Sequence, residues 1–296
     1  MIINSNGGTP GISRRRLLGS AAAVGGLSLG LSSVPGAAHA ATWENIIEKS
    51  CFDSSADFAR YWNYNYPWEG EPDAHNGAAR MHPSQVSIDQ GVLTLTADRL
   101  SAPDGRSTHE PHAPLWYRSG AIHARQQIVV DDRFPEYDIE GEFRTDTGFG
   151  VWPAFWTTGV WPVWPPETDI LEYVGDSVNL FNTWYRDPGT GSATYERTTV
   201  EVENPGEWHT YRVWMVKDGD DVLLDYYFGR PGGKVWQATH RGIGWAGIPM
   251  WLIVNLQMGS WASGVEEGKR GWEEQPGPVT AQFQARNVWA GRTRTR

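Results

Sequence analysis

The chain has 296 residues, a formal net charge of −10 at pH 7 and one cysteine. The acidic balance argues against nucleic acid or an anionic membrane as a partner, because both attract basic surfaces. The lone Cys51 excludes an intrachain disulfide and a thiolate metal cluster, so the fold must depend on a large apolar core.

The first forty residues have the features of an export signal. The sequence S-R-R-R-L-L at residues 13–18 is typical of a twin-arginine signal. It leads into an apolar run, residues 17–34, that is too short and too weakly apolar for a membrane span. Small residues at 38–40 fit an A-x-A cleavage site. We therefore expect a secreted protein whose signal peptide, residues 1–40, is removed near Ala40, with no membrane partner after export.

Two-residue alternation recurs through the rest of the chain, whereas runs with a helical period are scarce. Residues 92–97 place Leu93 and Leu95 on one side of a strand, and residues 279–289 alternate in the same way. Turn sequences separate such runs, and no linker divides them. This pattern predicts an all-β chain with one domain over residues 41–296, a concanavalin-like β-jelly-roll sandwich with a concave cleft. We expect a monomer.

Three acidic side chains lie close together in the segment P-P-E-T-D-I-L-E-Y-V-G at residues 165–175. Residues two apart in a regular strand share a face, so Glu167 and Asp169 point together and Glu172 points to the opposite face. That arrangement would drive an unpaired charge into an apolar core at a heavy cost. A bulge that inserts one residue near residues 170–171 returns Glu172 to the side of the other acids. The burial cost therefore predicts this bulge.

Three like charges on one strand face repel one another and contribute poorly to stability. Retaining glycoside hydrolysis uses such crowding, because one carboxylate attacks the anomeric carbon while a second, kept protonated, donates to the leaving oxygen. The two groups lie about 5–5.5 Å apart in such enzymes, and a third acid between them helps to separate their pKa values. Taken alone, the three acids also fit an exposed acidic edge strand or a calcium site.

The surrounding sequence resembles glycoside hydrolase family 16, which includes laminarinases, lichenases, agarases and carrageenases. The family motif E-[ILV]-D-x-(x)-E matches the three acids in its bulged form. The segment G-V-W-P-A-F-W at residues 150–156 is similar to a laminarinase strand, and P-M-W-L-I-V-N-L at residues 249–256 is similar to a later one. The resemblance extends from about Phe52 to Trp289.

This resemblance implies a β-jelly roll and a retaining endo-β-glycosidase. Glu167 would be the nucleophile, Glu172 the acid/base and Asp169 their helper. The resemblance implies no required cofactor, and although some family members hold a structural calcium, nothing in the sequence selects its ligands. Two positions depart from the pattern. Thr168 replaces an Ile, Leu or Val, and Asn182 lies on the next strand, where laminarinases and agarases usually carry a histidine.

Alternation also predicts which other residues share the acid-bearing side. The chain contains 17 tryptophans, and flat sugar faces stack on indole rings, so we expect some tryptophans to bind the polysaccharide substrate. Core packing is the structural alternative for each tryptophan, and an internal hydrogen bond is the alternative for each amide. The residues expected to contact substrate are Trp152, Trp156, Asn182, Trp184, Trp251, Asn255 and Gln257. The histidines at positions 75, 82, 109, 112 and 123 lack metal-ligand spacing, so we expect no catalytic metal.

The substrate stays open at this point. The strand similarities favour a β-1,3-glucan of the laminarin kind. The missing histidine and the tryptophans around Trp161 and Trp164 keep a β-galactan of the agar or carrageenan kind as an alternative. A non-catalytic carbohydrate-binding jelly roll would also explain the tryptophans, but it gives no reason for three acids on one face.

Overall fold

The computed structural model describes residues 41–110, 112–263 and 277–295. The predicted signal peptide, residues 1–40, lies outside the described residues, so its expected cleavage stays a prediction. No helix in the described part of the chain is long and apolar enough to cross a membrane. Within the same described ranges, helical structure is limited to α1 (Ser55–Tyr61) and two short 3₁₀ turns, η1 (Pro83–Gln85) and η2 (Ser260–Ser263).

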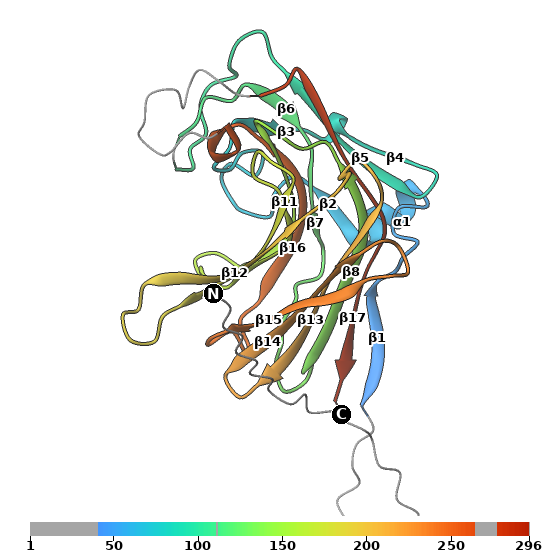
Figure 1. Ribbon diagram of the computed structural model, residues 1–296, viewed down its shortest axis with the longest axis vertical. Coiled ribbons are helices and arrows are strands. Elements are labelled where there is room, and N and C mark those ends of the chain that lie inside the picture. The colour runs from blue at the N-terminus through green and yellow to red at the C-terminus, as the bar shows by residue number, and fades with distance from the viewer. Residues whose placement is uncertain (1–40, 111, 264–276, 296) are drawn as a thin grey trace, which may run out of the picture. The chain divides into compact units, whose positions relative to one another are not determined.

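The strands form two sheets that pack face to face (Figure 1). The ten-stranded sheet contains, in spatial order, β15 (Val235–Gly242), β14 (Asp221–Gly229), β13 (His209–Asp218), β8 (Glu136–Thr145), β17 (Thr280–Arg294), β5 (Val92–Arg99), β6 (Tyr117–Ser119) and β3 (Ala79–Met81), with β1 (Thr42–Ile47) paired to β17 and β4 (Val86–Asp89) paired to β5. The seven-stranded sheet contains β12 (Ala193–Glu201), β11 (Val178–Arg186), β10 (Glu167–Glu172), β9 (Val151–Gly159), β16 (Met250–Met258), β7 (Ala121–Ala124) and β2 (Trp62–Tyr64).

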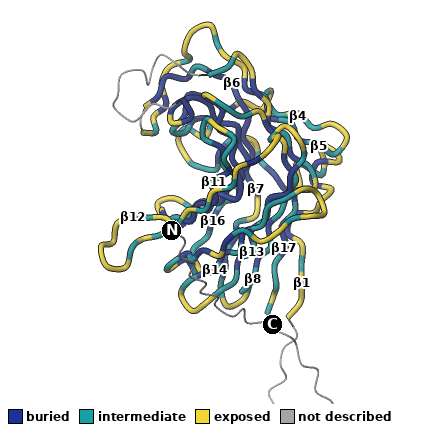
Figure 2. Tube along the Cα trace, in the orientation of Figure 1, coloured by how far each residue is buried: buried dark blue, intermediate teal, exposed yellow. Residues whose placement is uncertain are grey.

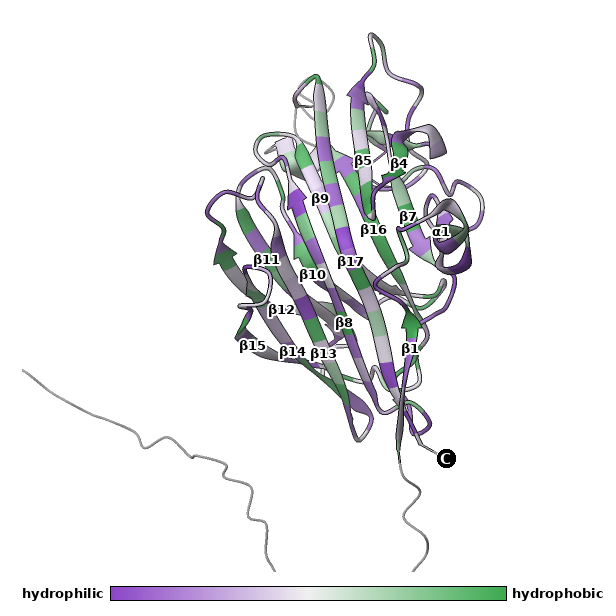
Figure 3. Cartoon of the chain, turned by 90° about the vertical axis from the view of Figure 1, so that its right-hand side faces the viewer, coloured by the Kyte–Doolittle hydropathy of each residue, from purple (hydrophilic) through white to green (hydrophobic). Residues whose placement is uncertain are grey.

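The core lies between the two sheets, where alternate side chains of each strand meet. Leu93 and Leu95 of β5 are fully buried, as the alternation of that segment predicts. The buried segments run through the facing centres of the sheets, and exposed residues gather in the connecting loops (Figure 2). Hydrophilic and hydrophobic residues alternate along β13 and β17 (Figure 3). The predicted jelly-roll sandwich is confirmed.

Along the strand β16, core-facing residues alternate with residues on the opposite side of the sheet. Its inward residues Leu252, Val254 and Leu256 are fully buried in the core, which confirms the predicted core face. The intervening residues therefore belong to the opposite side of the sheet, called here the outer face, which points away from the core. The acid-bearing strand β10 lies two strands from β16 in the same sheet.

Candidate active site

A bulge in β10 places all three acids on the outer face. Glu167 pairs with Thr158 of β9 and Asp169 pairs with Trp156, after which the register shifts between Asp169 and Leu171. As a result Glu172 pairs with Ala154. Residues 158, 156 and 154 are successive residues on one face of β9, so their three acidic partners share that face as well. The predicted bulge is confirmed.

Cross-strand pairing extends this arrangement into rows across the outer face. Residues directly opposite one another share a face of the sheet. One row contains Arg197, Asn182, Asp169, Trp156 and Ile253 on β12, β11, β10, β9 and β16 respectively. The next row contains Tyr195, Trp184, Glu167, Thr158 and Trp251 on the same five strands. The outer face thus combines aromatic rings with the acids.

Asn182 joins two of the acids. Its Nδ2 donates to Asp169 Oδ2 at 2.8 Å and to Glu172 Oε2 at 2.9 Å. Arg197 Nε donates to Asn182 Oδ1 at 2.6 Å. A guanidinium group can only donate, so the Asn182 oxygen must face Arg197 and its NH₂ group must face the carboxylates. Arg197 therefore sets the orientation of the amide.

Two indole N–H groups hold the glutamates. Trp152 Nε1 donates to Glu172 Oε1 at 2.9 Å, and Trp164 Nε1 donates to Glu167 Oε2 at 3.0 Å. The backbone N–H of Glu172 donates to Asn179 Oδ1 at 3.0 Å. These neutral donors fix the carboxylates without placing a cation against either of them.

Burial raises the pKa of each acid, because a low-dielectric surrounding disfavours the charged form. The pKa of Glu167 rises to about 8 through burial and the nearby charge of Glu172, although the Trp164 hydrogen bond opposes this rise. Burial, Glu172 and Glu167 together raise the pKa of Asp169 well above its usual range. Burial also raises the pKa of Glu172, against the influence of Trp152, Arg197 and Asn182. A raised pKa lets a carboxyl group keep its proton to higher pH, which favours general acid catalysis.

Comparison with known proteins agrees with this geometry. The family model for glycosyl hydrolases family 16 matches residues 75–285. The chain is 35% identical to a galactan endo-β-1,3-galactanase of Flammulina velutipes, over 81% of this chain and 88% of that protein. The chain belongs to glycosyl hydrolases family 16. It is therefore a glycoside hydrolase that acts as an endo-β-glycosidase, and retention of configuration is typical of this family.

More distant relatives share the family or the fold. The endo-1,3-1,4-β-glycanase ExsH of Rhizobium meliloti (strain 1021) is 27% identical over 70% of this chain, a match that spans 40% of that protein. The laminarinase catalytic domain of Thermotoga maritima MSB8 superposes with a TM-score of 0.57 at 16% identity and covers 86% of this chain and 99% of the domain. The endo-1,3-β-glucanase of Streptomyces sioyaensis gives a TM-score of 0.54 at 17% identity, with 88% and 99% coverage of the two chains. These two structures share the family 16 fold.

The family 16 motif carries an unusual threonine here, and the structure shows a partner for it. Thr168 is fully buried on the core face, and its Oγ1 lies 2.5 Å from the hydroxyl of Tyr226 on β14. The Tyr226 hydroxyl also lies 2.6 Å from Thr183 Oγ1 and donates to the carbonyl oxygen of Asn182 at 3.1 Å. His240 Nδ1 lies 3.1 Å from the same Thr183 hydroxyl. A buried polar network thus takes the place of an aliphatic contact behind the acids.

Several residues expected to contact substrate have defined places in the structure. Trp152 and Trp156 are only 8% and 7% exposed, and Trp156 Nε1 donates to Asn255 Oδ1 at 2.7 Å. Both indole N–H groups are thus engaged within the protein, and little of either ring is open to a polymer. Trp184 and Trp251 are half-buried on the outer face. Contact between these residues and a sugar stays a prediction.

Gln257 has a structural role that alternation did not reveal. It is 2% exposed, and its Oε1 accepts hydrogen bonds from the backbone N–H groups of Ala79 at 2.9 Å and Met258 at 3.0 Å. Its Nε2 donates to the Tyr66 hydroxyl at 3.3 Å. The side chain is therefore occupied in supporting the loop before β3, and in this structure it is not presented to a polymer.

Two contributors were missed when the site was predicted from the sequence. Arg197 lies fifteen residues after Asn182, on a strand whose alternating exposed and half-buried residues read as an ordinary edge strand. The hairpin register would have placed it beside Asn182. Trp164 precedes the motif by three residues, and its bond to Glu167 depends on the path of the intervening loop. Among the described residues, no group of three or more His, Cys, Asp or Glu side chains could hold a metal ion.

Proposed function

We propose that this family 16 enzyme is a retaining endo-β-1,3-galactanase. The observation that carries the proposal is the 35% identity, over 81% of this chain and 88% of the other, to a galactan endo-β-1,3-galactanase. The replacement of the laminarinase histidine by Asn182 fits a substrate other than laminarin. A secreted enzyme would meet such a polymer outside the cell, so we also propose that residues 1–40 direct export.

In the proposed mechanism the ionised carboxylate of Glu167 attacks the anomeric carbon while the bond from that carbon to the glycosidic oxygen breaks. Glu172 donates a proton to the departing oxygen, and a covalent glycosyl-enzyme intermediate forms. Glu172 then removes a proton from water, which displaces Glu167 and restores the original configuration. The free carboxyl and carboxylate groups are regenerated at the end of the cycle.

The donors around Glu172 favour its charged form, whereas the first step requires it to be protonated. Asp169 offers a source for that proton, because burial and its two acidic neighbours raise its pKa. The NH₂ group of Asn182 contacts both carboxylates. We propose that the proton moves from Asp169 to Glu172 when a sugar fills the site and removes water, and that it returns to Asp169 when the product leaves.

Substrate choice is tested by initial rates of reducing-end release from β-1,3-galactan, laminarin, agarose and carrageenan. We expect β-1,3-galactan to be cleaved fastest, with oligosaccharides of several lengths as early products and retained configuration in the first product by NMR. Glu167→Gln, which preserves volume, should lower the rate by several orders of magnitude. Inverted configuration would overturn the retaining mechanism.

A β-1,3-glucanase is the second candidate, because the strands at residues 150–156 and 249–256 are similar to those of laminarinases. Galactose and glucose differ only in the orientation of the hydroxyl at C4, so the two substrates form a matched pair. Cleavage of laminarin at least tenfold faster than galactan would favour this candidate and reject the galactanase proposal.

The roles of the two glutamates are separated by azide rescue. Glu172→Ala keeps the nucleophile, so an activated aryl glycoside should form the intermediate, and azide should release it as a β-glycosyl azide. Glu167→Ala leaves room on the opposite face, and azide should there give the α product. The reverse pairing of product and variant would exchange the two assignments.

A further inference from the structure

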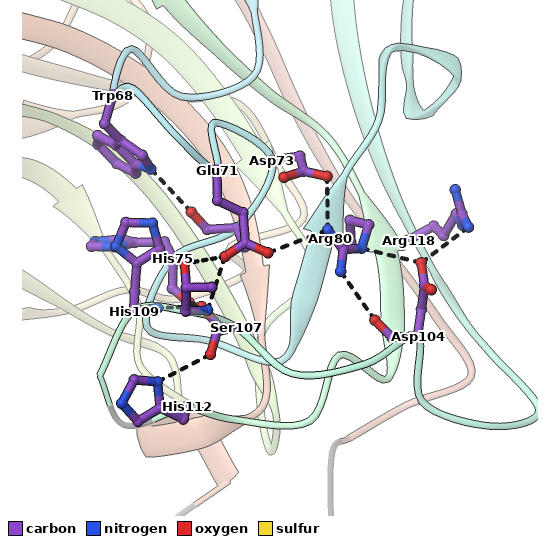
Figure 4. Close-up of polar contacts among 12 residues, drawn as sticks. Trp68, Glu71, Asp73, His75, Arg80, Asp104, Ser107, His109, His112 and Arg118 are labelled. Atoms are coloured by element: carbon purple, nitrogen blue, oxygen red, sulfur yellow. Dashed lines mark hydrogen bonds and ion pairs between the residues drawn. The ribbon is translucent and has the colours of Figure 1, made fainter.

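A cluster of rings lies beside Trp156, on the side of the acids opposite Trp164 and Trp184. Trp68 and His75 come from the loop between β2 and β3, and His109 comes from the loop between β5 and β6; these three residues are called here the histidine cluster. The ring centroids of Trp68 and His75 lie 4.8 Å apart, and those of His75 and His109 lie 5.7 Å apart. Figure 4 shows the three rings together.

The position of the histidine cluster places it near the reacting bond. The His75 ring lies nearly parallel to Trp156, with an interplanar angle of 9° and a centroid distance of 6.0 Å. Trp156 pairs directly with Asp169. Neighbouring strands lie about 4.8 Å apart, so the cluster is next to the strand that carries the acids. A polymer that crosses the outer face at the acids would pass this cluster with its neighbouring sugar units.

Both imidazoles have unused hydrogen-bonding atoms. His75 Nδ1 and His109 Nε2 are buried and have no hydrogen-bond partner among the described residues, although most buried polar atoms in proteins have one. Burial, with a smaller contribution from His109, lowers the pKa of His75 to about 3. His75 is therefore neutral at working pH, with one nitrogen donating and the other accepting. Each of the three cluster residues is half-buried, so part of each ring meets solvent.

Charges near the histidine cluster disfavour an anionic ligand. Arg80 contacts Asp73 at 2.8 Å, Asp104 at 3.1 Å and Glu71 at 3.5 Å. Arg118 adds one further contact to Asp104 at 3.2 Å. Three carboxylates therefore face two guanidinium groups, which leaves excess negative charge beside the cluster. A neutral sugar fits these surroundings better than a sulfated or uronic acid unit.

The same contacts hold the two loops together before any ligand arrives. Arg80 joins the loop that carries Asp73 to the loop that carries Asp104 (Figure 4). Ser107 Oγ donates to the carbonyl oxygen of His75 at 2.7 Å, and Trp68 Nε1 donates to that of Ala74 at 3.0 Å. A binding surface that is already ordered loses less entropy when it binds.

We propose that the histidine cluster is a sugar-binding subsite for a neutral pyranose unit beyond the two units that flank the bond that is cut. His75 forms a hydrogen bond to a hydroxyl of that unit, and Trp68 contacts its apolar face. The inference rests on the proposed function only in requiring a neutral β-linked polymer, whether galactan or glucan. His75 thus makes the enzyme favour longer oligosaccharides over shorter ones, and neutral sugar units over charged ones.

Kinetics of His75→Ala and His75→Asn on neutral β-1,3-linked oligosaccharides of increasing length test this assignment. Loss of one hydrogen bond to the sugar should raise KM about five- to tenfold on long oligosaccharides, with kcat nearly unchanged. The shortest cleavable oligosaccharide, which does not reach the cluster, should show no change. Asn places its amide group near the imidazole Nδ1 position and should recover part of the affinity.

His112→Ala is the matched control. His112 lies on the His109 loop, its side chain is 51% exposed, and its Nδ1 lies 3.1 Å from the carbonyl oxygen of Ser107. This variant removes an exposed imidazole from the same loop but no cluster ring, so KM should stay at the parent value. An unchanged KM for both His75 variants at every length, or equal losses at every length, would overturn the subsite. Laminarin-derived oligosaccharides are used if galactan is not cleaved, so failure of the galactanase proposal is distinguished from failure of the subsite.

Discussion

At the scale of single residues, neutral hydrogen-bond donors and one cation set the orientation and the pKa values of the three acids. Asn182 contacts Asp169 and Glu172 together, and Arg197 orients the Asn182 amide. Arg197 also lowers the pKa of both acids, in opposition to their burial. Arg197 therefore influences the orientation of the carboxylates through the amide and their charge through its own electrostatic field.

Replacement of Arg197 by Met should move the alkaline limb of the kcat/KM profile to higher pH. That limb reports the loss of the proton from the general acid in the free enzyme. Removal of the cation disfavours the charged form of Glu172, so its pKa should rise and the proton should be retained to higher pH. Arg197→Lys keeps the charge and should shift the limb less. Arg230→Met, which removes a pair with Glu207, should leave the profile unchanged, and a downward shift for Arg197→Met would contradict the electrostatic role.

Glu167→Gln should stabilise the fold at alkaline pH. The pKa of Glu167 rises from 4.5 to about 8 on folding, so the folded state binds more protons than the unfolded state between these values. Stability therefore falls as pH rises through this interval. A neutral glutamine does not titrate, so the melting temperature of the variant should exceed that of the parent increasingly from pH 5 to pH 9. The exposed Glu201→Gln should show no such divergence, and a parent that is more stable at pH 9 would refute the raised pKa.

At the scale of elements, β10 was largely predictable from its sequence. The cost of burying Glu172 required an extra residue, and the register confirms that Ile170 lies within the bulge. Alternation also identified the core face of β16 correctly. The hydrogen bonds of Gln257 could not be predicted, because its partners Ala79 and Tyr66 are 178 and 191 residues away in the sequence. A period of two assigns a side chain to a face, but not to the loop that covers that face.

Thr168 and Tyr226 should be energetically coupled, because their hydroxyls join β10 to the opposite sheet. Tyr226→Phe leaves the buried hydroxyls of Thr168 and Thr183 without a partner at that position and should cost about 1–3 kcal/mol. Thr168→Val should cost less, since Tyr226 keeps its contacts with Thr183 and Asn182. The double variant should lose less than the sum of the two single losses. Denaturant unfolding of all four proteins measures this coupling, and strict additivity would show that the contact contributes nothing.

At the scale of the whole molecule, the sandwich follows from many short alternating segments, whereas the site depends on pairing over long sequence distances. The sequence motif predicted the acids. Arg197 and the histidine cluster, in contrast, are brought to the site only by the order of the strands and the packing of the loops. The first and last described strands also meet, since β1 pairs with β17. No disulfide within the chain supports this arrangement, so the sandwich depends on its core and its strand pairing.

Cys51 should therefore report unfolding of the whole domain. Its side chain is fully buried, its Sγ donates to the carbonyl oxygen of Val288 at 3.3 Å, and burial raises its pKa to about 12. The thiolate is the reactive form, so the folded protein should react with a thiol reagent at pH 8 only as fast as it opens.

A Cys51→Ala protein with Ser192→Cys, an exposed position between β11 and β12, should react at once and serves as the control. Denaturant should accelerate labelling of Cys51 in step with the loss of folded signal, and a reductant should leave the melting temperature unchanged. Rapid stoichiometric labelling of the folded parent would show that the segment before α1 opens independently of the sandwich.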